Sequence, residues 1–214
     1  MAVDLSQILV IGVSSRALFD LEEENTIFNE KGLLEFRKYQ YEHENELLKP
    51  GTAFYLVKSL LELNKQASKP IVEVVVMSRN SPETGVRVMN SIKVHGLDIS
   101  RLAFTGGESL YGYIAGYDVD LFLSKDPEDV QKVIDSGSSA AALIYAPPSE
   151  FNSETSRVKI AFDADAVLFS DDSEFRYKTE GLDACQKHEK ENFTRLSLGS
   201  RFFGHFKCPK YFAG

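Results

Sequence analysis

Two carboxylates, Asp163 and Asp165, follow an apolar run in the segment VKIAFDADAVLFSDDSE (158–174). Where a strand ends and the chain turns, side chains at positions i and i+2 can both reach one ligand. One such carboxylate can attack a phosphoryl phosphorus and form an acyl phosphate, and a second can protonate the leaving oxygen and then activate water. A carboxylate and a backbone carbonyl also suit Mg²⁺, which keeps several of its waters. The pattern predicts phosphoryl transfer; the alternative is a strand that runs into a solvated acidic turn.

Five further residues are candidates for binding the phosphate of a substrate. Ser78 follows the apolar run IVEVVVM, and Arg79 precedes an expected helix start, where an anion is favoured. A surface salt bridge is an equally good interpretation of Arg79. Gly106 and Gly107, in TGGES, could offer backbone N–H groups to a phosphate, although a simple turn is the alternative. Lys125, which follows VDLFLS, is the last candidate, and only the family resemblance described below implies its role.

The elements that must position these residues alternate along the chain. Short runs rich in β-branched residues, several apolar on both faces, predict strands of a parallel sheet covered by helices. Longer amphipathic segments between them predict helices, and the alternation predicts an α/β fold, a doubly wound and mostly parallel sheet with helices on both faces and ligands at the carboxyl ends of its strands. The expected strands are 7–13, 71–77, 101–106, 119–124, 141–146, 158–163 and 166–170, and the expected helices lie within 21–48, 50–64, 81–96 and 126–137.

Two of the expected helices carry recognisable start signals. Ser81 is expected to cap one helix with Pro82 at its first position, and Asp126 is expected to cap another in the same way with Pro127 following. Gly137 is expected to end the second helix. The acidic run DLEEEN (20–25) is expected to be a solvated helix face or turn.

The sequence also contains two pairs of segments that resemble each other, which indicates an internal repeat. Segment 8–24 resembles 158–174, since both contain an apolar strand, small or polar residues, an Ala-Leu-Phe or Ala-Val-Leu-Phe hook and an acidic stretch. In this alignment Ser14 and Arg16 stand where the second copy has its two aspartates. A helical segment after residue 180 would match one after residue 31. The alternative is chance similarity between charged helices.

Motif I of the haloacid-dehalogenase-type phosphatases, hhhhDxDx(T/V), resembles KIAFDADAV at every defined position. More narrowly, FDADAVLFSDDSE, VSSRALFD, YEHENELLKPGTAF and GVRVMNSI are similar to the cytosolic 5′-nucleotidase I family, which hydrolyses AMP and related monophosphates with Mg²⁺. The resemblance runs from about residue 7 to 192. It implies a haloacid-dehalogenase-like fold, Asp163 as nucleophile and Mg²⁺ ligand, and Asp165 as general acid/base that also binds the metal.

Two arrangements follow from this resemblance, because the superfamily's remaining site residues normally come after motif I and do not do so here. In the first, residues 1–150 form a Rossmannoid α/β half with a degenerate motif I, and 151–214 begin a second, incomplete phosphatase half that carries the DxD motif. In the second, strand 158–163 completes the first sheet and its Asp163 meets Ser78 and Lys125. The first arrangement follows the family more closely and predicts weak or absent activity. A nucleotide-binding or regulatory module without turnover is the competing hypothesis.

Composition argues against two classes of binding partner, nucleic acids and membranes. The 214 residues are 43% hydrophobic and 26% charged, with a net charge of −8, which argues against a nucleic-acid partner. Two cysteines without CxxC spacing indicate a reducing compartment, and no apolar stretch approaches the roughly 20 residues of a membrane helix. We therefore expect a cytoplasmic protein with no nucleic-acid and no membrane partner, and leave a homo-oligomer open. The family resemblance implies a small-molecule nucleoside monophosphate as its partner.

Overall fold

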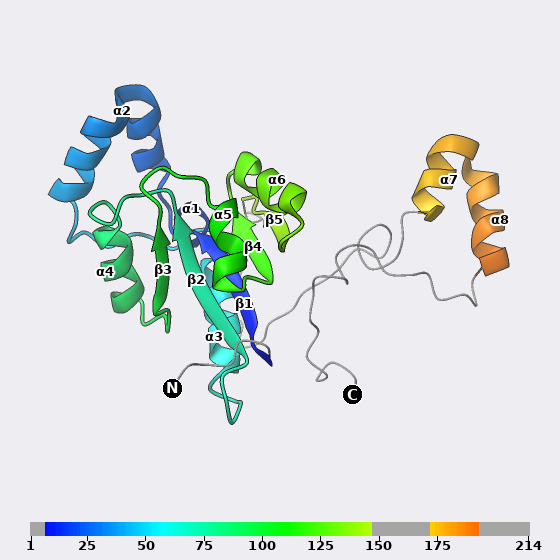
Figure 1. The fold of residues 1–214 in the computed structure, drawn as a ribbon, viewed down its shortest axis with the longest axis horizontal. Coiled ribbons are helices and arrows are strands. Elements are labelled where there is room, and N and C mark those ends of the chain that lie inside the picture. Colours follow the sequence, from blue (N-terminus) through cyan, green and yellow to red (C-terminus); the bar gives the residue numbers. More distant parts are fainter. Residues whose placement is uncertain (1–6, 147–171, 193–214) are drawn as a thin grey trace. The chain divides into compact units, whose positions relative to one another are not determined.

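A computed structural model describes residues 7–146 and 172–192 of the chain (Figure 1). The described residues fall into two units, 7–146 in the first and 172–192 in the second. Asp163 and Asp165, the expected strands 158–163 and 166–170, and hence the pairing of 8–13 with 158–163, lie outside the described residues.

The first unit is built on a five-stranded sheet in which every pair of neighbours is parallel, in the order β3-β2-β1-β4-β5. This confirms the predicted α/β fold and five of the predicted strands. Because β1 lies between β2 and β4, the chain leaves it in opposite directions, and such a switch point opens a crevice at the carboxyl ends of the strands. The strands are β1 (Leu9–Ser14), β2 (Val72–Ser78), β3 (Arg101–Phe104), β4 (Leu121–Ser124) and β5 (Ala140–Leu143).

Helices cover both faces of this sheet, because successive strand residues point to opposite sides. Ile11 and Val13 pack with α1, α3 and α4, whereas Val10 packs with Ile114 of α5 and Val133 of α6. The helices are α1 (Ser15–Leu18), α2 (Glu22–Glu42), α3 (Phe54–Leu63), α4 (Val86–Val94), α5 (Tyr111–Ile114) and α6 (Pro127–Ser136), and a 3₁₀ turn (Ala115–Tyr117) follows α5.

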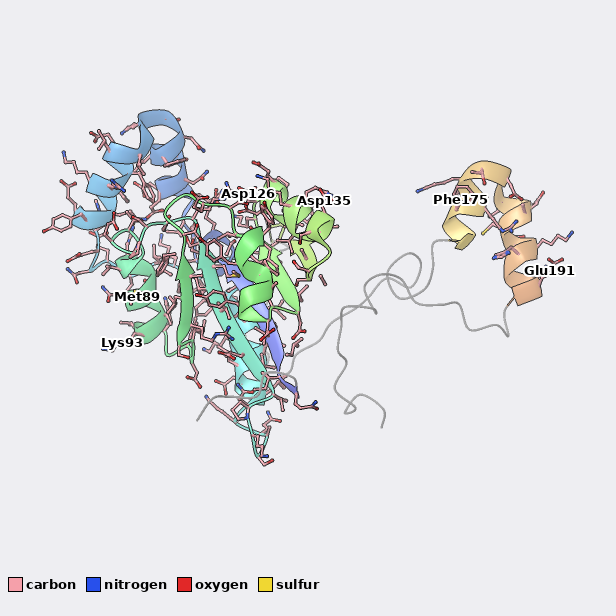
Figure 2. All side chains as sticks on the ribbon, in the orientation of Figure 1. Met89, Lys93, Asp126, Asp135, Phe175 and Glu191 are labelled. Carbon is pink, nitrogen blue, oxygen red and sulfur yellow. The ribbon has the colours of Figure 1, made fainter. Side chains whose placement is uncertain are left out.

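The helix α4 shows why amphipathic spacing identified these segments. Val88 and Ile92 are buried, four positions apart on one face. Figure 2 shows Met89 and Lys93 on the outer side of the same helix.

The predicted start of α4 was wrong, whereas the predicted start of α6 is confirmed. The N–H groups of Thr84 and Gly85 donate to the carbonyl of Ser81 (3.1 and 3.0 Å), so residues 81–85 form a turn and the helix begins at Val86. The turn lies tight against β3: a Cβ on Gly85 would come within 2.6 Å of the Phe104 ring. In α6, by contrast, the Asp126 carboxylate accepts from the N–H groups of the first turn and Pro127 follows it; Gly137 ends the helix in the left-handed conformation.

The second unit consists, in its described part, of α7 (Asp172–Glu180) and α8 (Leu182–Asn192). Gly181 separates them at φ 90°, a conformation that favours glycine. The internal repeat required a helix after residue 180, and α8 confirms that part of the prediction. None of the helices described in residues 7–146 and 172–192 combines the length and the apolar character of a membrane span.

Gly51 is the glycine on which the first unit depends most for close packing. A Cβ at this position would lie 2.7 Å from the backbone oxygen of Ala17 and 2.7 Å from the carbonyl carbon of Phe19. Backbone atoms cannot move aside as a flexible side chain can, so we expect Gly51→Ala to lower the free energy of unfolding by about 1–3 kcal/mol. Urea unfolding followed by circular dichroism measures this change.

A matched control for this prediction is Gly112→Ala. Gly112 lies in α5 with no atom within 4 Å of an added Cβ, and alanine is the better helix former. We expect this variant to be neutral or slightly stabilised. Equal unfolding midpoints for Gly51→Ala and Gly112→Ala would contradict the close approach at Gly51.

Candidate functional site

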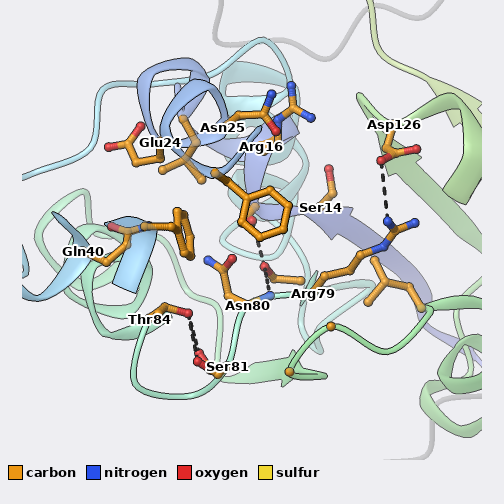
Figure 3. Close-up of a pocket in the computed structure, with 18 of the residues that line it drawn as sticks. Ser14, Arg16, Glu24, Asn25, Gln40, Arg79, Asn80, Ser81, Thr84 and Asp126 are labelled. Atoms are coloured by element: carbon orange, nitrogen blue, oxygen red, sulfur yellow. Dashed lines mark hydrogen bonds and ion pairs between the residues drawn. The ribbon is translucent and has the colours of Figure 1, made fainter. Parts of the chain in front are cut away.

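A pocket of about 520 Å³ lies at the carboxyl ends of β1, β2 and β4, where the sheet topology predicts a ligand site (Figure 3). Its volume is within the roughly 300–1,000 Å³ of typical small-molecule sites. One part of its lining comes from the residues that end these strands, and another part comes from α2. The two parts differ in chemistry.

Helix α2 turns one face of each of its halves to the pocket. The helix breaks at Gly32 (φ 81°, ψ −178°). Before the break, Glu24 and Phe28 share a face at the i, i+4 spacing; after it, Phe36 and Gln40 do the same, and all four line the pocket. Charged, aromatic and amide side chains mix on this face, and sequence periodicity alone therefore did not mark it.

The acidic run 20–25 was predicted to be solvated, and for Glu24 this prediction is wrong. Glu24 is only 5% exposed and forms a buried ion pair with Arg87 of α4. Arg87 also donates from Nε to the carbonyl of Glu46 (2.9 Å). The ion pair therefore attaches α2 to the body of the first unit, and no local sequence signal named its two partners.

Three buried hydroxyl groups form the floor of the pocket. Ser78 lies at the end of β2, as predicted, and its Oγ is 3.0 Å from that of Ser15. The Ser78 oxygen also accepts from the N–H of Asn80 (3.2 Å). Ser14 ends β1 and accepts from the N–H of Ala17 (3.3 Å), which caps α1. The sequence identified Ser78 and Ser14, but Ser15 emerged only from the fold.

Arg79 adds a positive charge beside these hydroxyl groups. It forms an ion pair with Asp129, and its Nη1 lies 4.0 Å from Oδ2 of Asp126 (Figure 3). Burial is the largest single influence and opposes the charged guanidinium, but the hydrogen bond to Asp129 and the negative charges of Asp129, Asp126 and Glu128 together raise the pKa of Arg79 above its ordinary value. Burial also raises the pKa of the Asp129 carboxyl, which Arg79 offsets only in part. The Nε of Arg79 is buried, and no residue in the described part of the chain accepts a hydrogen bond from it.

Gly106 and Gly107 line the same pocket, but their backbone N–H groups are already engaged. Gly106 donates to the carbonyl of Asn80 (3.0 Å), and Gly107 donates to the carbonyl of Arg79 (2.7 Å). Both glycines have positive φ, 64° and 103°. These hydrogen bonds connect the loop after β3 to the loop after β2, and the two glycines form a part of the pocket wall that has no side chains. Because both N–H groups already have acceptors, they are not available to bind a phosphate in this structure.

Lys125 does not line this pocket, although it directly follows β4. Its Nζ donates to Oε1 of Glu22 (2.5 Å), and the residue lines a separate, smaller pocket. The hydrogen bond to Lys125 lowers the pKa of the Glu22 carboxyl. The structure thus brings Ser78, Arg79, Gly106 and Gly107 together and places Lys125 outside the group.

The acidic side chains of the pocket do not form a shell for Mg²⁺. Glu24 pairs with Arg87, Asp129 pairs with Arg79, and Asp126 caps α6. Among the residues that the structure describes, no group of three or more His, Cys, Asp or Glu side chains could hold a metal. The predicted metal ligands Asp163 and Asp165 lie outside the described ranges.

Comparisons with known proteins place the chain in a family. The family model described as 5′-nucleotidase matches residues 1–201. Human cytosolic 5′-nucleotidase 1B is 36% identical over 181 residues, a match that covers 82% of this chain and 30% of that protein. The chain thus corresponds to less than a third of the length of this relative.

Two solved structures of the HAD domain of the effector protein Lem4 from Legionella pneumophila also match. One has a TM-score of 0.41 at 15% identity and covers 68% of this chain and 90% of that one. The other, an inactive mutant, has a TM-score of 0.38 at 14% identity and covers 86% and 97%. On the match of the family model and the identity to the human enzyme, the chain belongs to the 5′-nucleotidase family.

Proposed function

We propose that this chain is a Mg²⁺-dependent 5′-nucleotidase that hydrolyses nucleoside monophosphates such as AMP or IMP through an aspartyl-phosphate. Family membership supports hydrolysis of a nucleotide phosphate. The cytoplasm is the location that we propose with it, in keeping with the name of the human relative.

The observation that carries the proposal is the two-part chemistry of the pocket. Hydroxyl groups of Ser14, Ser15 and Ser78 and the guanidinium of Arg79 suit a phosphate. Phe28 and the amide-bearing face of α2 suit a ring with hydrogen-bonding edges. A nucleoside monophosphate combines these two kinds of group in one molecule.

The chemistry of turnover is assigned to the DxD pair. Asp163 would attack the phosphorus with its carboxylate oxygen while the bond from phosphorus to the nucleoside oxygen breaks, and Asp165 would give that oxygen its proton. Asp165 would then take a proton from the water that hydrolyses the acyl phosphate. Mg²⁺, held by the same two residues, would supply charge neutralisation.

A second candidate function is nucleotide binding without turnover. One observation favours it: the central strand β1 ends in Ser14, and the next pocket-lining residues are Ser15 and Arg16, so no carboxylate stands where a DxD motif would be. The pocket would then bind a nucleotide as a regulatory ligand.

Arg79→Gln tests whether the pocket takes the phosphate. We expect at least a 10-fold weaker affinity for AMP and for ribose 5-phosphate alike, because a charge-assisted hydrogen bond is worth about 1.5–3 kcal/mol. Calorimetric titration measures binding, and phosphate release from AMP with Mg²⁺ measures turnover. A parallel fall in kcat/KM supports a substrate pocket, whereas weaker binding with unchanged turnover supports the regulatory function.

The matched control is Arg101→Gln. Arg101 begins β3, at the opposite end of the strand from the pocket, and is also ion-paired, with Glu73 at 3.2 Å. We expect its affinity for AMP to equal that of the wild type. Wild-type protein that neither binds AMP nor releases phosphate from it would refute the proposal.

A further inference from the structure

We propose that Gln40 accepts a hydrogen bond from the amino group of a nucleobase and thereby determines which base the pocket prefers. The inference rests on the proposed function, in which the pocket holds a nucleoside monophosphate. It adds to that function the contact by which one base is told from another.

Gln40 has a buried hydrogen-bonding group that nothing in the described part of the chain satisfies. The residue is 3% exposed, it lines the pocket, and its Oε1 has no hydrogen-bond partner there. A buried carbonyl oxygen without a donor destabilises a folded protein, and native structures contain few of them. An N–H or O–H group of a ligand would remove this cost.

The surroundings of Gln40 suit a flat ring. Phe36 lies one helical turn before it, and the rings of Phe28 and Phe36 meet edge to face with centroids 5.7 Å apart. Phe36 is buried, while Phe28 is 47% exposed and retains apolar surface for a ligand. Aromatic side chains that line a pocket are good packing surfaces for a nucleobase.

The direction of the pocket decides which part of the ligand Gln40 meets. Figure 3 places Gln40 with Glu24 and Thr84 on one side of the pocket, and Arg79 with Asp126 on the other. With the phosphate beside Arg79, the group farthest from it, which is the base, lies on the side of Gln40. Oε1 is an acceptor, so it selects a base edge that donates, such as the exocyclic amino group of adenine.

Three ligands separate the parts of the nucleotide in one binding experiment on the full chain. AMP carries the amino group, purine riboside 5′-monophosphate lacks only that group, and ribose 5-phosphate lacks the whole base. We expect the wild type to bind AMP at least about 10-fold more tightly than the purine analogue, the usual worth of one buried hydrogen bond. Gln40→Leu should lose this preference while its affinity for ribose 5-phosphate stays within twofold of the wild type.

Two further variants make the result specific. Gln40→Met keeps the unbranched shape of glutamine and should lose the same preference. Gln66→Leu makes the same change of side chain at an exposed position in the turn after α3 and should keep it. Because Gln40→Leu removes an unsatisfied buried carbonyl, its melting temperature should not fall below that of the wild type.

The remaining outcomes distinguish an error about Gln40 from an error about the proposed function. Preference for AMP that survives in both Gln40 variants overturns the role of Gln40 and leaves the proposed function in place. An equal loss for AMP and ribose 5-phosphate overturns base reading, because Gln40 would then contact the sugar. Wild-type protein that binds none of the three ligands overturns the proposed function itself, and this inference with it.

Discussion

Asp163→Asn is expected to abolish phosphate release from AMP, the largest effect that we predict for any single substitution. The amide keeps the shape of the carboxylate but has no charged oxygen with which to attack phosphorus, so the acyl phosphate cannot form. It is also a poorer ligand for Mg²⁺, which favours carboxylate oxygens. Phosphate release with AMP and Mg²⁺ measures the loss, and chelation of Mg²⁺ from the wild type should reproduce it.

The neighbouring carboxylate supplies an internal comparison. Asp165→Asn should slow turnover by roughly 10²–10⁴-fold, the usual worth of a positioned acid/base, while AMP still binds. Beryllium fluoride with Mg²⁺ should attach at Asp163 as a mimic of the acyl phosphate. Wild-type turnover by Asp163→Asn, in protein cleared of contaminating phosphatase, would show that Asp163 is not the nucleophile. A wild type that binds AMP without hydrolysing it would instead support the regulatory function.

Arg87→Met is expected to lower the free energy of unfolding by about 3–5 kcal/mol, the largest effect on stability that we predict. The side chains of Arg87 and Glu24 are 8% and 6% exposed. Removal of the guanidinium leaves the Glu24 carboxylate buried without its partner, and an isolated buried charge is far more costly than the pair. The substitution also removes the hydrogen bond to the carbonyl of Glu46. Chemical denaturation followed by circular dichroism measures the change.

Two variants separate the lost pair from a general effect of removing arginine. Glu24→Leu combined with Arg87→Met removes both charges and should recover most of the lost stability, since apolar replacement of a whole buried pair is often close to neutral. Arg176→Met breaks an exposed pair with Glu180 (3.5 Å) and should leave stability unchanged within error. If Arg87→Met unfolds at the same denaturant concentration as Arg176→Met, the ion pair does not attach α2 to the first unit as we describe.

The sheet and the candidate catalytic pair were accessible from the sequence because both depend on local patterns. Residues 74–77 of β2 form a continuous apolar run, since a parallel sheet covered on both faces buries side chains on both sides of the strand. The ends of α6 were equally local: Asp126 caps the helix with its own side chain, and Gly137 supplies the left-handed residue that ends it. The DxD spacing of Asp163 and Asp165 is a local pattern too, and their catalytic roles remain a prediction.

The walls of the pocket were decided by the tertiary structure, because they depend on residues that lie far apart in the sequence. Ser81 carries a good capping signal, but its segment forms a turn that packs against Phe104 at Gly85. Lys125 follows the expected strand, but it pairs with Glu22, 103 positions away, and lies outside the pocket. The pocket face of α2 contacts a cavity instead of the apolar core, so it carries no continuous apolar stripe. Hydrophobic periodicity reports which side chains leave water on folding, and only the folded chain shows which buried polar groups still lack a partner.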